Sequence, residues 1–200
     1  MGEFAENILG MKEACEFLDY PVVSGNVSFY NGTNKNNIYP TPVIGGVGLI
    51  KNLKHIQNHR LKKIDSQILL IGKTFGHLGQ SAFLEEIYSI KDGVSPEINL
   101  SNEKNNGDAV LKLIHSGLVR SVHDVSSGGI ILSMAEMCLS SMIGVKLIKP
   151  KKLTNVFEYF FGEDQGRYLV EIDKKNYIKI EKLLKEHNIF FENIGVTQNE

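Results

Sequence analysis

Residues 123–129 read His-Asp-Val-Ser-Ser-Gly-Gly, and the second half of the chain is organised around them. The β-branched residues before this stretch predict a strand over 119–125, and the apolar residues after it predict a central helix over 129–139. Ser126 or Ser127 can cap that helix, and free N–H groups at a glycine-rich helix start form an anion site without any basic residue. Asp124 could then reach a magnesium ion that bridges phosphates. Alternatively, Asp124 and the serines simply satisfy the helix end.

Strands and helices alternate on both sides of this stretch, which predicts a mixed α/β domain. The run Ile68-Leu69-Leu70-Ile71-Gly72 is continuously apolar and of strand length, so we expect a strand buried on both faces. Gly117 suits the left-handed stop of the helix before it. The remaining predicted strands cover 145–148, 168–172 and 189–196, and the predicted helices cover 81–89, 108–115 and 174–187.

The first 63 residues are organised differently. Apolar residues at helical spacing predict a helix over 3–18, and short apolar runs predict strands at 21–23 and 43–50. Residues 30–42 are rich in Asn, Gly and Thr and predict a long loop. The segment 51–63 is basic and polar, which indicates a linker and a domain boundary, although a surface helix would have the same composition.

The turn over 24–31 (SGNVSFYN) is the first further candidate for chemistry. Gly25 at a strand end lets the backbone approach a bulky ligand, and Asn26 offers a neutral oxygen to a hard cation such as magnesium. Ser28 can donate to a phosphate or a carboxylate. An ordinary polar turn between a strand and a loop explains the same residues.

Two other segments have polar residues beside predicted strands. Residues 76–81 (GHLGQS) open a helix after a strand but lack the Lys-Ser/Thr of a P-loop, so a structural turn is the favoured interpretation. Residues 161–167 (FGEDQGR) gather two carboxylates, the amide of Gln165 and a guanidinium just before a strand. Surface ion pairing explains that gathering as well as a functional site does.

The composition excludes several classes of function. The chain has 200 residues with 22 Lys and Arg against 23 Asp and Glu, so the net charge of -1 argues against nucleic acid or an anionic membrane as the main partner. Two cysteines cannot build a disulfide framework, and no apolar run is long enough to cross a membrane. No His and Cys cluster has zinc spacing. The expected location is the reducing cytoplasm.

Taken together, the runs PVVSGNVSFYNGTN, YPTPVIGGVGLI, GHLGQS, HDVSSGGI and FGEDQGRYLV closely resemble the second half of phosphoribosylformylglycinamidine synthase subunit II. HDVSSGG also resembles the wider superfamily of aminoimidazole ribonucleotide synthetase. The resemblance implies an α+β fold: an aminoimidazole ribonucleotide synthetase-like C-terminal domain over 53–200, lacking its last segment. Residues 1–52 resemble the end of a truncated N-terminal-type domain, so the chain resembles a fragment.

The reaction implied by this resemblance is the ATP-dependent ligation of formylglycinamide ribonucleotide with ammonia to formylglycinamidine ribonucleotide, in purine biosynthesis. The implied partners are a glutaminase subunit, which supplies the ammonia, and a small bridging subunit. Carried over by motif, Gly25 binds ATP, Asn26 binds Mg²⁺ and Ser28 binds the substrate. The family's catalytic histidines match no position of this chain.

His123, Asp124 and Gln165 occupy positions that the resemblance relates by symmetry to catalytic ones. We therefore expect them to serve an auxiliary nucleotide site or the structure. The alternative function is a non-catalytic module that binds nucleotide or assembles with a partner. In either case the chain alone is expected to be inactive. The apolar face of the helix over 3–18 is expected to lack a partner, which predicts association or disorder within residues 1–50.

Overall fold

The computed structural model describes residues 2–29, 32–34, 36–148, 150 and 155–199. The chain divides into two compact units, Met1–Leu49 and Ile50–Glu200. Among the described residues, no helix is both long enough and apolar enough to span a membrane.

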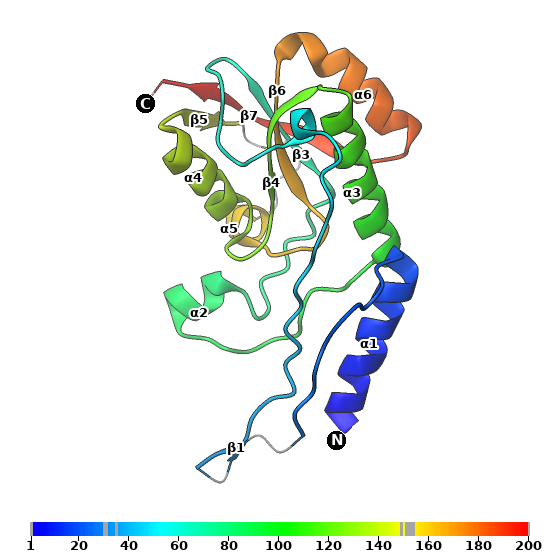
Figure 1. Cartoon of the computed structure of the whole chain (residues 1–200). Coiled ribbons are helices and arrows are strands. Elements are labelled where there is room, and N and C mark those ends of the chain that lie inside the picture. Colours follow the sequence, from blue (N-terminus) through cyan, green and yellow to red (C-terminus); the bar gives the residue numbers. More distant parts are fainter. Residues whose placement is uncertain (1, 30–31, 35, 149, 151–154, 200) are drawn as a thin grey trace. The chain divides into compact units, whose positions relative to one another are not determined.

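The second unit is built on one five-stranded sheet in which every neighbouring pair is antiparallel (Figure 1). Its strand order is β4-β6-β3-β7-β5, so β3 lies at the centre and β4 and β5 form the edges. The predicted α+β class is therefore confirmed. The strands are β3 Gln67–Ile71, β4 Val119–Asp124, β5 Gly144–Leu147, β6 Tyr168–Ile172 and β7 Phe191–Gln198.

Helices cover both faces of this sheet (Figure 1). On one face, α3 and α6 pack on Leu69 and Ile71; on the other, α4 packs on Ile68 and Leu70. Because successive side chains of a strand point to opposite faces, all four residues are fully buried, as the apolar run predicted. The helices are α2 Ala82–Tyr88, α3 Leu100–His115, α4 Gly129–Ser141, α5 Val156–Phe161 and α6 Tyr177–Glu186, with 3₁₀ turns at Leu53–His55 and Lys174–Asn176.

Two helices differ from the sequence-based expectation. Helix α3 begins eight residues earlier than predicted, at Leu100, because the Asn99 side chain caps it by accepting from the Asn102 amide. Helix α5 was not predicted, although Asn155 marks its start by accepting from the Phe157 amide. The stop at Gly117 is confirmed: this residue has a φ of +63°.

The first unit contains the predicted helix, α1 Gly2–Leu18, and a hairpin of two-residue strands, β1 Gly32–Thr33 and β2 Asn36–Asn37. The predicted strands over 21–23 and 43–50 are wrong, because neither run pairs with a neighbour in the sheet ladders. A strand needs a hydrogen-bonded partner, whatever its β propensity. Val22 is 76% exposed and Val43 93% exposed, and α1 has no buried residue.

The boundary between the units falls at residues 49 and 50, beside the basic segment 51–63. This segment forms a single 3₁₀ turn followed by chain without helix or strand, so the alternative of a surface helix is wrong. The assignment of 1–52 and 53–200 to two domain types of a synthetase stays a prediction.

Candidate functional site

Three of the four candidate motifs meet in the second unit, around the side chains of residues 163–167. Asp164 is 4% exposed, and its carboxylate accepts three backbone N–H groups of the loop after β3. The donors are Phe75 at 3.0 Å, Gly76 at 2.9 Å and His77 at 3.1 Å. Consecutive N–H groups around one anion form a nest, and here the anion is the protein's own.

Arg167 is the second buried charged residue beside the 75–77 amides and is 1% exposed. Its guanidinium donates to the Thr74 hydroxyl at 3.0 Å, the Gly162 carbonyl at 2.6 Å and the Asp164 carbonyl at 3.1 Å. The Asp164 carboxylate lies 3.8 Å away. Burial lowers the pKa of Arg167, and the carboxylates of Asp164 and Glu163 act in the opposite direction. Surface ion pairing therefore does not describe residues 161–167, because their charged pair is buried.

Glu163 joins two helix starts. Its Oε1 accepts from the amide of Ala82, the first residue of α2, at 2.8 Å, and from the amide of Gly128, immediately before α4, at 2.7 Å. The expectation of free N–H groups at the α4 start is therefore wrong for Gly128. Neither Ser126 nor Ser127 caps α4 through its side chain. One N–H of the expected anion site therefore donates to an internal carboxylate.

Close backbone approach explains the glycines of these motifs. Gly129 has a φ of +69°, and a Cβ there would lie 2.7 Å from the carbonyl oxygens of Phe160 and Gly162. Gly76 has a φ of +82°, and a Cβ there would lie 2.6 Å from the Cβ of Glu158. Larger residues at either glycine would separate the loops. We call residues 74–82, 126–129 and 161–167 the carboxylate hub.

His123 and Asp124 lie beside the hub, at the end of edge strand β4. The His123 Nε2 atom lies 2.8 Å from the Glu136 carboxylate of α4, and Nδ1 lies 3.3 Å from that of Asp124. Asp124 has an exposed side chain at 67%. Gln165 is exposed, and its amide lies 3.5 Å from the Glu163 carbonyl. The expected auxiliary or structural role of all three stays a prediction.

Gly25, Asn26 and Ser28 belong to the first unit, where each is exposed on chain without helix or strand. A Cβ at Gly25 would meet nothing within 4 Å, so its backbone is open to a ligand. Their assigned roles stay predictions. Within the described part of the chain, no group of three or more His, Cys, Asp or Glu side chains could hold a metal ion.

Sequence reasoning missed Glu171, the fully buried carboxylate of β6. It accepts from the amides of Lys62 at 2.8 Å and Lys63 at 3.0 Å and from the Ser121 hydroxyl at 3.1 Å. A single charged residue in an otherwise apolar strand was the available signal, because such a residue is buried only with partners. Glu136, the partner of His123, gave a similar signal, because it is the single charged residue of α4.

Comparison with known proteins gives one family. The family described as "AIR synthase related protein, C-terminal domain" matches residues 63–200, more than half of the chain. The chain is 50% identical over all 200 residues to phosphoribosylformylglycinamidine synthase subunit PurL of Pelagibacter ubique, strain HTCC1062. It is 42% identical over 197 residues to the PurL subunit of Nitrobacter winogradskyi, strain Nb-255.

These matches cover only part of the relatives. The chain spans 27% of each of the two PurL subunits, while 100% and 98% of the chain is covered. Among solved structures, T. maritima PurL complexed with FGAR covers 74% of this chain with a TM-score of 0.60 and 17% identity, and the match covers 26% of that chain. T. maritima PurL complexed with ATP covers the same share with a TM-score of 0.58. At such identity the likeness shows the fold alone.

The antiparallel sheet, its likeness to the solved PurL structures and the matches over the whole sequence agree with one another. The chain belongs to the AIR synthase related protein family, whose C-terminal domain it carries at residues 63–200, and it is a homologue of about a quarter of PurL.

Proposed function

We propose that this chain forms part of an ATP-dependent ligase that converts formylglycinamide ribonucleotide and ammonia to formylglycinamidine ribonucleotide. The observation that carries the proposal is the 50% identity to a PurL subunit over the whole chain. The chain spans about a quarter of that subunit, so the activity, substrates and partners belong to an assembly of which this chain is one part. Alone, the chain is inactive.

The turn over 24–31 is the part of this chain that contacts ATP, Mg²⁺ and substrate in the proposal. Gly25 contributes an open backbone to ATP, since nothing lies within 4 Å of the Cβ position. Asn26 contributes an amide oxygen, a ligand type that Mg²⁺ accepts, and the remaining ligands come from outside the turn. Ser28 contributes a hydroxyl to the substrate. ATP, when bound, supplies the phosphoryl group that activates the substrate amide oxygen for displacement by ammonia.

The carboxylate hub acts on this reaction only through the geometry it maintains. Asp164 and Arg167 are buried, and Oε1 of Glu163 is occupied by two backbone N–H groups, so these groups hold the loops together. A rigid scaffold of this kind fits an enzyme in which positioning supplies most of the catalysis. The proposed partners are a glutaminase subunit and a small bridging subunit in the cytoplasm. A solved relative is described as the structure of PurLQS from Thermotoga maritima, which supports an assembly of this kind.

A chimaera tests the proposal. This chain replaces the matching quarter of the Pelagibacter ubique PurL subunit, and the formation of formylglycinamidine ribonucleotide is measured with ATP, Mg²⁺ and ammonia. We expect activity, and we expect Asn26→Ala to lower it at least about tenfold through weaker Mg²⁺ binding. Asn36→Ala changes an exposed asparagine of the β1–β2 hairpin and serves as the matched control. A folded chimaera without activity would count against the proposal. Equal activity of the Asn26→Ala and Asn36→Ala variants would count against the assignment of Asn26 to Mg²⁺.

The second candidate function is a nucleotide-binding module without turnover. His123 and Asp124 beside a glycine-rich helix start favour it, whereas the Glu163 carboxylate on the Gly128 amide weighs against phosphate binding there. Calorimetry of the chain with ADP and Mg²⁺ separates the two. Heat of binding that His123→Ala removes would support the module, and no heat at millimolar ADP would reject it.

A further inference from the structure

Residues 80–98, which we call the α2 segment, carry apolar side chains that the second unit leaves uncovered. Every residue from 85 to 95 is exposed, so helix α2 is covered only near its start. The large apolar side chains of this stretch are Ile87 at 65%, Tyr88 at 55%, Ile90 at 45% and Val94 at 75% exposure. Neighbouring exposed apolar residues of this kind mark a surface for another protein.

Aromatic rings join the α2 segment to α5. The ring of Phe83, the buried residue of α2, lies with its centroid 5.5 Å from that of Tyr88 and 5.5 Å from that of Phe157 on α5. Phe83 is 8% exposed, whereas Phe157 is 52% exposed. Val156 of α5, at 51%, extends the exposed area. The cluster therefore runs from the core to the surface, as the anchor of a protein interface does.

The α2 segment is fixed at its base. The backbone amide of Gln80 donates to the Asp92 carbonyl at 3.1 Å, and its side-chain amide donates to the Gly93 carbonyl at 2.9 Å. Glu163 holds the start of α2 through the Ala82 amide. Because both ends are tied, the exposed part of the helix is preformed. A preformed surface loses less conformational entropy when a partner binds.

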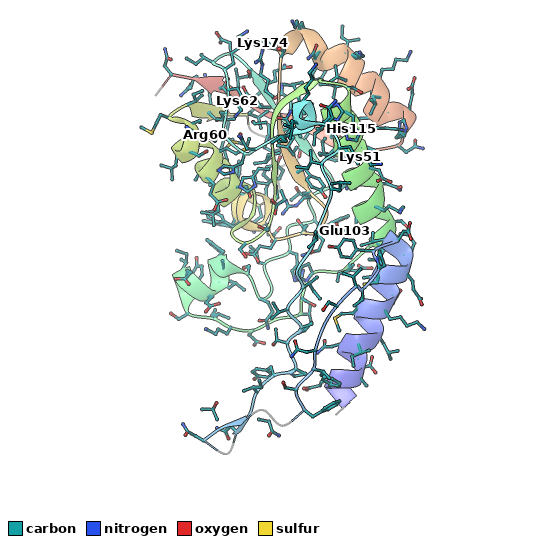
Figure 2. All side chains as sticks on the ribbon, in the orientation of Figure 1. Lys51, Arg60, Lys62, Glu103, His115 and Lys174 are labelled. Carbon is teal, nitrogen blue, oxygen red and sulfur yellow. The ribbon has the colours of Figure 1, made fainter. Side chains whose placement is uncertain are left out.

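The α2 segment is acidic. It has one cation, Lys91, against four carboxylates, those of Glu85, Glu86, Asp92 and Glu97. Lys91 pairs with Glu85 at 2.5 Å, and the other three form no salt bridge among the described residues. Lys62 and Lys174 lie at the other end of the sheet, where β3 begins, whereas α2 follows the end of β3 (Figure 2). Carboxylates therefore outnumber cations around the apolar surface.

Charge distinguishes between the kinds of partner that could cover this surface. Two copies of the chain that met face to face through their α2 segments would bring carboxylates together, and such repulsion weakens binding. A partner surface with an apolar centre and a basic rim matches both the aromatic cluster and the carboxylates. The chain spans 27% of the PurL subunit of Pelagibacter ubique, so the proposed ligase brings further protein surface to this unit.

We propose that the α2 segment docks on the remaining part of a PurL-type ligase, through a partner surface with an apolar centre and a basic rim. The identity of this partner rests on the proposed function. Ile87, Tyr88 and Phe157 form the apolar centre on this chain, and their burial supplies most of the binding free energy. Glu86 and Glu97 pair with the basic rim, which fixes the orientation of docking.

Amide hydrogen exchange of the chain alone and of its chimaera with the Pelagibacter ubique PurL subunit tests the docking. The reporter is the Ser89 amide, which donates to the Glu85 carbonyl at 3.0 Å, and the reference is Val170 of β6. The ratio of the Ser89 to the Val170 protection factor should be at least about tenfold higher in the chimaera, because a covered helix end opens less often. An equal ratio in the two proteins would overturn the proposal.

The activity of the chimaera reports on the proposed function separately. An active chimaera in which Ser89 gains no protection rejects the docking and leaves the ligase proposal standing. An inactive chimaera in which Ser89 is protected supports the docking and counts against the ligase proposal.

A matched pair of variants tests the apolar centre. Ile87→Ser should lower the protection ratio of the chimaera at least about fivefold, as the loss of a buried anchor does. It should leave the urea midpoint of the chain alone unchanged, because the Ile87 side chain is exposed there. Ile178→Ser changes an isoleucine of α6 that is 77% exposed and should have neither effect. Equal ratios for the two variants would contradict the proposal.

A charge reversal tests the basic rim. Glu86→Lys should lower the protection ratio of the chimaera at low salt and less so at high salt, since exposed charges are screened. A higher ratio for this variant would overturn the assigned chemistry of the partner. If a second copy were the occupant, the protection of Ser89 in the chain alone would rise with protein concentration. Such a rise would also overturn the proposal.

Discussion

The Oε1 atom of Glu163 lies 2.7 Å from the amide nitrogen of Gly128, so the carboxylate of one sequence motif occupies the helix start of another. The same atom accepts from the Ala82 amide at 2.8 Å. One side chain therefore joins the starts of α2 and α4. The Gly128 amide at the start of α4 therefore binds a carboxylate of the protein itself, and the same carboxylate links α4 to α2.

Removing the Glu163 carboxylate should destabilise the second unit. Glu163→Ala leaves the Ala82 and Gly128 amides without their charged acceptor, and we expect a loss of about 2–4 kcal/mol in the free energy of unfolding. Glu163→Gln keeps an acceptor oxygen and should cost about half as much. Urea denaturation measures both, with Glu186→Gln, at the exposed end of α6, as a control. If Glu163→Ala has the same urea midpoint of unfolding as the wild type, the contacts of Glu163 with the two helix starts do not stabilise the fold.

The buried pair of Asp164 and Arg167 should behave as a coupled unit. Asp164→Asn or Arg167→Met alone leaves one buried charge without its partner, which costs about 3–5 kcal/mol. The double variant removes both charges and should cost less than the sum of the single losses. Urea denaturation of the four proteins gives the coupling free energy. Simple additivity would contradict a direct interaction between the two side chains.

Two glycines with the same backbone conformation provide a test of close packing. Gly117→Ala introduces a Cβ at a φ of +63° into open space, and we expect a loss of about 1 kcal/mol. Gly129→Ala has a φ of +69° and also brings the Cβ to 2.7 Å from two carbonyl oxygens. Its loss should exceed that of Gly117→Ala by at least about 1–2 kcal/mol, which thermal unfolding can measure. Equal losses would mean that the chain around residues 161–167 can move away from the added Cβ without a loss of stability.

The pair of Arg120 and Asp173 predicts a pH dependence of stability. A hydrogen bond from Arg120 at 2.7 Å, opposed by partial burial, holds the pKa of Asp173 below its ordinary value. A lowered carboxyl pKa stabilises the fold above the unfolded value near 4, and this contribution is lost as the pH falls through the folded value. Asp173→Asn should therefore lower stability at pH 7 by no more than about 1 kcal/mol. In urea titrations the difference should shrink as the pH falls below about 4, and a constant difference would exclude a role of the charge.

The exposed apolar residues of the first unit predict self-association. Val22, Val43 and Val47 are 76%, 93% and 93% exposed, and apolar surface of this extent is rare on soluble monomers. Light scattering should give a mass that rises with protein concentration, and Val43→Asp together with Val47→Asp should reduce that rise. A constant monomer mass for the wild type would contradict the expectation.

Much of the second unit could be predicted because local pattern and packing agree there. The apolar run at 68–71 forms the central strand, and the stripe of the helix before Gly117 contacts the sheet, since these residues are buried wherever the strands pair. The same reasoning failed at 21–23 and 43–50. Their β-branched residues favour a strand, but among the described residues of the first unit no neighbouring strand pairs with them.

Residue types and spacing alone therefore predicted a mixed α/β domain, the main strands and helices of the second unit and the segments worth attention, because periodicity and helix stops are local properties of the chain. The α+β class was an expectation from the resemblance of the motifs to a known family. The tertiary structure decided which groups meet: Glu163 with Gly128, Asp164 with the 75–77 amides, and the Asn58 carbonyl with the Val122 amide of β4. These pairs lie 35 or more residues apart in sequence. Whether a glycine-rich helix start binds a phosphate or an internal carboxylate depends on such distant partners, which no local pattern encodes.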